Sequence, residues 1–282
     1  MDLRRPAPSR SSEPLPDLSA WTTHLLAAPL PVLAETAARL EELRAVEDAV
    51  DAHLLADVIA PDPLMTLKLF AHVAGVRTAR RSGDPETATE ALVLLGIGPF
   101  FRAFGPQPTV AEHLAGLPQA LAGFDAVLQR ARRAAAFAMG FAVHRMDADA
   151  AVLHTAALLH DAAELLLWLH APALALRAAR AQTADSNLHS AAAQRALLHI
   201  ELAELQQALL RAWRLPELLL RAADDRHDQT AQVKNVTLAL RIARHSERGW
   251  DNPALGDDVR DAALLLNLGQ TPTLELLREL DG

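Results

Sequence analysis

Residues 150–170 read AAVLHTAALLHDAAELLLWLH, and this stretch decides the fold. Alanine and leucine dominate it, and it contains neither glycine nor proline, so it predicts one long helix. The helix is apolar nearly all round, which predicts that it is buried. His154, His160, Asp161 and Glu164 nevertheless lie within it. Burying an imidazole beside a carboxylate is costly unless both have partners, so the His160–Asp161 doublet is the first candidate for a functional site.

The composition favours an all-α protein. The chain has 282 residues, of which 51% are hydrophobic and 22% charged, enough for a large core. Long runs of Ala, Leu, Arg and Glu at helical spacing, with few β-branched blocks, favour helices throughout. Cysteine is absent, which excludes disulfides, thiolate zinc sites and cysteine nucleophiles. The formal charge of −8 opposes binding to nucleic acid.

The N-terminal segment and the most apolar helix together predict a cytoplasmic location. Residues 1–17 are rich in Arg, Pro and Ser and lack an apolar run, so they predict a disordered tail and not a signal peptide. The most apolar helix carries His, Asp and Glu side chains, which argues against a membrane span.

A hinge divides the rest of the chain. Residues 105–108 read GPQP, four consecutive loop-forming residues. We therefore expect two packed helical subdomains, at residues 18–105 and 106–282. In the first, Asp62 is expected to cap a helix that has Pro63 at its first position. In the second, Phe124–Val143 and Ser190–Trp213 are each expected to form one helix.

Several segments in a fixed order point to a family. They are LPVLAETAARLEEL, LLADVIAPDPLMTLKLFAHVAG, ATEALVLLGIGPFFRAF, AALLHDAAELLLWL and LLRAWRLPELLLRAADDRH. From Leu30 to Arg248 this order resembles the HDOD domain, the HD-related output domain of bacterial signalling proteins. The resemblance implies an all-α fold in which an N-terminal helical half packs on an HD-like half.

The resemblance also bears on metal binding. HD-superfamily phosphohydrolases bind metal through a His, a His-Asp doublet and a later Asp, and the metal activates water. Aligned with that pattern, this chain keeps the doublet as His160-Asp161 but has Arg130 at the first position and Arg244 at the last. Arginine has no lone pair to offer and stays charged, so it cannot bind a cation. The family's Gly-Lys after the doublet is replaced by Ala163-Glu164.

These replacements suggest that protein cations neutralise the buried acid. A guanidinium fork suits a carboxylate, so we expect Arg130 or Arg244 to pair with Asp161 where a metal is bound in the enzymes. The candidate pocket is therefore His160, Asp161, Glu164, Arg130 and Arg244. We expect it to hold neither a metal nor another cofactor.

Two alternatives remain open. One is a divergent phosphohydrolase whose metal is bound by His160 and Asp161 and completed by other side chains. The candidates to complete it are His144, His154 or His199 for the imidazole, and Asp224 or Asp225 for the acid. The other alternative is a cyclic dinucleotide sensor, because Arg130, Arg132 and Arg133 in QRARRAAAF could attract phosphates.

The resemblance implies a role in signalling without catalysis. We expect a stand-alone adaptor that interacts with an unidentified bacterial signalling protein or senses a ligand. An apolar groove between the two halves, or the polar pocket around the doublet, is the expected docking surface.

Overall fold

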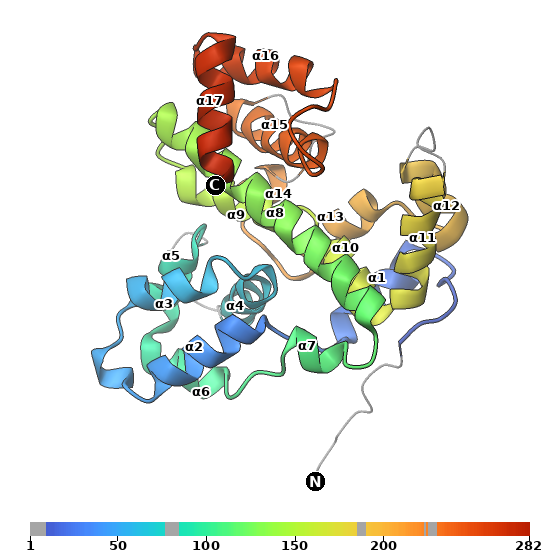
Figure 1. Ribbon diagram of the computed structural model, residues 1–282. Helices are drawn as coiled ribbons and strands as arrows, with labels where there is room; N and C mark the ends of the chain where they lie inside the picture. The colour runs from blue at the N-terminus through green and yellow to red at the C-terminus, as the bar shows by residue number, and fades with distance from the viewer. Residues whose placement is uncertain (1–9, 77–84, 185–189, 223, 225–229) are drawn as a thin grey trace.

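A computed structural model describes residues 10–76, 85–184, 190–222, 224 and 230–282. Within those ranges every regular element is a helix (Figure 1), apart from one isolated bridge between Val32 and Thr109. The predicted all-α class is therefore confirmed. Residues 1–9 of the predicted tail lie outside the described ranges. Beyond them, the Ser11 amide donates to the His170 carbonyl oxygen at 2.9 Å.

Short helices make up the N-terminal part. They are α1 (Leu18–Ala27), α2 (Ala34–Arg44), the 3₁₀ turn η1 (Glu47–Ala49), α3 (Ala52–Ile59), α4 (Pro63–Val76), α5 (Ala88–Leu95), α6 (Ile97–Ala103) and α7 (Val110–His113). Asp62 caps α4 as predicted, because its Oδ1 accepts hydrogen bonds from the amides of Leu64 and Met65. Its Oδ2 also accepts one from the Leu33 amide, so the same buried carboxylate fixes the start of α2.

A long central helix organises the second part. The helices there are α8 (Pro118–His144), α9 (Ala150–Leu159), α10 (Ala162–His170), α11 (Pro172–Ala184), α12 (Ser190–Leu198), α13 (Leu202–Ala212), α14 (Glu217–Ala222), α15 (Ala231–His245), α16 (Leu255–Leu266) and α17 (Gln270–Asp281). α8 packs against α9, α10, α11, α15 and α17 (Figure 1). It places Arg130 in the middle of the molecule, facing the doublet.

Two clusters of apolar side chains form the core. One joins α2 to α6 with the second half of α8, α9 and α14 to α17. The other joins α1 and α7 with the first half of α8 and α10 to α13. α1 therefore packs against α13, although the sequence places it in the N-terminal subdomain. This packing does not show whether either half folds alone, so the boundary at Gly105 stays a prediction.

Two of the expected single helices are interrupted. The stretch 150–170 divides into α9 and α10 at His160-Asp161, so the prediction of one continuous helix is wrong. The stretch from Ser190 to Trp213 divides into α12 and α13 near His199, whose φ of 64° is left-handed. Neither break contains glycine or proline. Tertiary contacts, described below for the doublet, stabilise the first of them.

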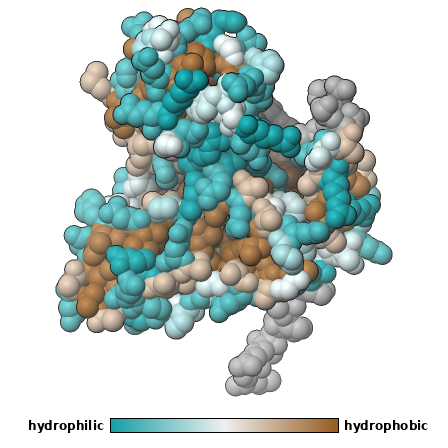
Figure 2. Space-filling model, viewed as in Figure 1, coloured by the Kyte–Doolittle hydropathy of each residue, from teal (hydrophilic) through white to brown (hydrophobic). Residues whose placement is uncertain are grey.

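The most apolar helical stretch is an interior one. Among the described residues, only Ala150–His170 is long and apolar enough to cross a membrane, and 72% of its most apolar window is buried inside the protein. On the face shown in Figure 2, brown apolar surface runs along the lower part of the molecule, where α2, α6 and α7 lie. The centre of that face, over α8, is mostly hydrophilic.

Candidate functional site

The doublet lies at the junction of α9 and α10. His160 and Asp161 are the turn residues between these helices, and Gln206 on α13 bridges the gap. The Gln206 side-chain amide donates to the Leu159 carbonyl oxygen, and its carbonyl oxygen accepts from the Ala163 amide at 2.7 Å. Gln206 thus satisfies backbone groups that the break would otherwise leave unpaired, and it fixes where the doublet points.

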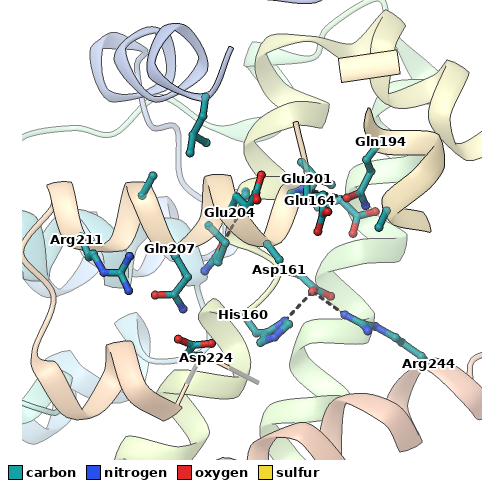
Figure 3. Close-up of a pocket in the computed structure, with 17 residues that line it drawn as sticks. His160, Asp161, Glu164, Gln194, Glu201, Glu204, Gln207, Arg211, Asp224 and Arg244 are labelled. Carbon is teal, nitrogen blue, oxygen red and sulfur yellow. Dashed lines mark hydrogen bonds and ion pairs between the residues drawn. The ribbon is translucent and has the colours of Figure 1, made fainter. Parts of the chain in front are cut away.

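Two arginines hold the doublet's carboxylate, one on each oxygen. Arg130 Nε donates to Asp161 Oδ2 at 2.9 Å, and Arg244 Nη2 donates to Oδ1 at 3.3 Å. Arg130 Nη2 also donates to Glu164 Oε2 at 2.7 Å. His160 Nδ1 lies 3.1 Å from Asp161 Oδ1. These contacts bring together all five residues of the candidate pocket, with the ion pairs that the sequence suggested. Figure 3 shows four of them, His160, Asp161, Glu164 and Arg244.

The two arginines differ in burial. The side chain of Arg130 is 13% exposed and that of Asp161 6%, so they form a buried ion pair. The side chain of Arg244 is 48% exposed and contacts Asp161 from the solvent side. Arg130 is thus a structural counterion, whereas Arg244 is a partly solvated second one.

Charge and burial shift the acids of this pocket in opposite directions. Burial raises the pKa of Asp161, but Arg130, the hydrogen bond to His160, and Arg244 outweigh it and hold that pKa well below its usual value. Burial also raises the pKa of Glu164, and there Arg130 offsets only part of the effect. Arg130 itself loses stability as a cation by burial, but the charges of Asp161 and Glu164 raise its pKa. At neutral pH Asp161 and Arg130 are therefore both charged.

This set of side chains does not fit a divalent metal. Both Asp161 oxygens already accept from guanidinium groups, and a cation placed beside them would face two positive charges. Within the part of the chain that the structure describes, no three His, Asp or Glu side chains are grouped so that they could hold a metal ion. His144, His154, His199 and Asp224 are among those described residues and do not complete a site. Asp225 lies outside them.

An open cavity of about 530 Å³ adjoins the doublet. Its floor includes His160, Asp161 and Glu164, and Arg244 stands at one side. The opposite wall is α13, which contributes further polar side chains that the sequence interpretation missed: Glu201, Glu204, Gln206, Gln207 and Arg211 (Figure 3). Three of them share one helix face, at Glu204, Gln207 and Arg211. This spacing of three and four residues could have predicted that the three side chains share a helix face. It could not have predicted a cavity wall, because a charged helix face usually faces only solvent.

The three clustered arginines of α8 do not form one site. Arg130 faces the doublet, and Arg132 pairs with Glu35 and donates to the Pro61 carbonyl oxygen. Arg133 Nη2 donates to Asp281 at 2.9 Å and to the Ser246 hydroxyl at 2.7 Å. Because successive residues of a helix point in different directions, these cations stabilise three separate contacts.

Comparison with known proteins places the chain in a family. The model of the HDOD domain family matches residues 30–229. No curated protein matches the chain. Among solved structures, the MmoQ response regulator of Methylococcus capsulatus strain Bath is 25% identical, with a TM-score of 0.66 over 88% of this chain and 98% of that one. A virulence factor of Campylobacter jejuni shares the fold at 17% identity, with a TM-score of 0.63 over 94% of this chain and 98% of that one. On its match to the family model, the chain belongs to the HDOD domain family.

Proposed function

We propose that this chain is a non-catalytic, cytoplasmic signalling module that works as an adaptor for another bacterial signalling protein. The single observation that carries the proposal is the pairing of Asp161, whose two oxygens are held by Arg130 and Arg244. In a metal-dependent phosphohydrolase those oxygens would be free to bind metal and orient water. Here the two Asp161 oxygens form ion pairs within the protein, so the doublet is not free to bind a catalytic metal.

The cavity beside the doublet is the site we propose for sensing or docking. It keeps a polar floor and a polar α13 wall, and it is large enough for a small ligand or for side chains of a partner. Likeness to a protein named as a response regulator supports a place in signalling. The family match supports the same reading.

Metal analysis and turnover test the proposal directly. The purified chain is loaded in turn with Mn²⁺, Fe²⁺ and Zn²⁺, desalted, and analysed for bound metal and for hydrolysis of bis(p-nitrophenyl) phosphate. We expect bound metal far below one ion per chain and no hydrolysis above the rate of an Asp161→Asn variant. One bound ion that the Asp161→Asn variant fails to hold, together with turnover, would establish the phosphohydrolase alternative instead.

The same purified chain also tests the alternative that the protein is a cyclic dinucleotide sensor. Titration calorimetry with cyclic di-GMP is expected to show no binding, because Arg130, Arg132 and Arg133 already have protein partners. Binding that is lost in an Arg132→Ala variant, which removes the most accessible of these contacts, would contradict the adaptor proposal and favour a nucleotide sensor. An Arg39→Ala variant, which changes an exposed arginine on α2, serves as the control.

A further inference from the structure

Three imidazoles gather where α1, α7 and the end of α10 meet. His170, the last residue of α10, is 2% exposed, and its ring centroid lies 5.1 Å from that of His113 on α7. His24 of α1 is the third, and it is close enough for its charge to act on His170. The Nε2 atoms of His24 and His170 are buried and have no hydrogen-bond partner among the described residues. We call these three residues the histidine cluster.

The segment before α1 lies against this cluster. The Ser11 amide donates to the His170 carbonyl oxygen at 2.9 Å, and the Arg10 side chain donates to the His113 carbonyl oxygen. Helix α1 contributes the third imidazole. The cluster therefore forms part of the contact that attaches residues 10–17 and α1 to α7 and α10, and a charge placed there acts on that contact.

The surroundings of the histidine cluster oppose a positive charge. The charged and titratable groups that act on His170 are the other two imidazoles and the Arg10 guanidinium, and none of the main influences on its pKa is a carboxylate. The neighbouring acids are engaged elsewhere, because Glu112 accepts a hydrogen bond at the start of α7 and Asp17 accepts one at the start of α1. A proton on one imidazole would therefore create a buried cation that faces only neutral or positive groups.

Burial lowers the pKa of His170 from its ordinary 6.5 to about 3, and the other imidazoles and Arg10 add to the effect, although a hydrogen bond with the Pro29 backbone offsets part of it. Burial also lowers the pKa of His113, against a hydrogen bond with the Leu169 carbonyl oxygen. An imidazole released into water regains its ordinary pKa, so the released form takes up protons below pH 6.5 while the attached form stays neutral. The attached form is thus fully favoured above pH 6.5 and loses stability as the pH falls from 6.5 toward 3.

We propose that the histidine cluster makes the attachment of residues 10–17 and α1 sensitive to acid, so that proton uptake shifts them from attached toward released. Leu18 of α1 lines the cavity beside the doublet, so release would also open that cavity on one side. This consequence rests on the proposed function, whereas the acid-sensitive contact itself does not. No member of the cluster lines the cavity, so the two proposals fail separately.

Thiol labelling measures the release on the full chain, which has no cysteine of its own. Ala28→Cys places one thiol at the end of α1, where the parent side chain is 9% exposed. Its rate of reaction with 4,4′-dithiodipyridine, divided at each pH by the rate of the same thiol in a short unstructured peptide, gives the released fraction. One imidazole with the two pKa values of His170 makes this fraction rise about thirtyfold between pH 7.5 and pH 5.0, so we expect a rise of that size or larger.

Matched variants separate this release from acid unfolding of the whole chain. Ala56→Cys places a thiol on α3, at an alanine that is 5% exposed in the other apolar cluster, and its protection should change far less with pH. With the thiol at position 28, His170→Asn should remove most of the rise, because asparagine does not titrate. His144→Gln, which changes an exposed histidine at the end of α8, should leave the rise unchanged.

Circular dichroism at pH 7.5 checks that each variant is folded. If His170→Asn does not fold, His113→Gln, at a half-buried position, should reduce the rise instead. The absence of a rise would overturn the proposal, and so would a rise that is equal at the α1 and α3 thiols. A rise that persists unchanged in the histidine variants would overturn it as well.

Discussion

At Asp161 a buried carboxylate has two cationic partners of very different burial, and their contributions should differ accordingly. Removing Arg130 would leave the buried Asp161 with His160 and the half-exposed Arg244, and would take the paired cation from Glu164 as well. An isolated buried charge costs more than a surface ion pair returns.

We predict that Arg130→Met lowers the free energy of unfolding by about 3–5 kcal/mol. Arg244→Met, by contrast, should lower it by less than about 1 kcal/mol, because solvent screens that half-exposed contact. Urea denaturation followed by circular dichroism measures both. If Arg130→Met does not fold, Arg130→Lys keeps the charge, loses the fork and should give an intermediate loss. Equal losses in the two Met variants would contradict the assignment of Arg130 as the main counterion.

Among the helices, the interruption between α9 and α10 is the feature that shapes the site. An unbroken helix would pair the backbone groups of residues 159 and 163 internally. In the broken form the Gln206 side chain pairs them instead, and the doublet turns toward Arg130. Helix α13 therefore stabilises the junction through the two hydrogen bonds of Gln206.

We predict that Gln206→Leu lowers the free energy of unfolding by about 2–5 kcal/mol, because two buried backbone groups lose their partner. Amide hydrogen exchange at Ala163 should become faster in the same variant. Glu204→Leu, an exposed position on the same helix, should stay within about 0.5 kcal/mol of the parent. Unchanged exchange at Ala163 would show that the junction is fixed by something other than Gln206.

On the scale of the whole molecule, helix α1 packs into the half of the chain that follows the predicted hinge. Trp21 of α1 is fully buried in the cluster formed by α10 to α13, and its indole Nε1 donates to the Leu198 carbonyl oxygen at 2.9 Å. The segment before the predicted hinge thus completes the core behind the doublet cavity.

We predict that Trp21→Ala lowers the free energy of unfolding by about 3–5 kcal/mol. Hydrogen exchange in α12 and α13 should speed up more than exchange in α3 and α5, which belong to the other cluster. Leu26→Ala, on the exposed side of the same helix, is the matched control and should change little. Faster exchange in α3 and α5 but not in α12 would mean that α1 stabilises its own half.

The sequence alone determined the class of fold and most helix positions, and it predicted the five residues that contact one another around the doublet. These follow from local signals: the 3.6-residue spacing of apolar side chains, the Asp62-Pro63 start of α4, and two arginines standing where metal ligands were expected. Such signals lie within one helix or one aligned position, so they can be read without the fold.

Only the tertiary structure decided where the helices break and what surrounds the doublet. His160 and Asp161 disfavour a helix only weakly, and the break is stabilised by Gln206, more than forty residues away in the chain. The same holds for the α13 wall of the cavity, for α1 packing on the distant half, and for the histidine cluster of α1, α7 and α10. Each depends on which helix faces meet, and a helix face does not specify its partner, because apolar contact is non-directional.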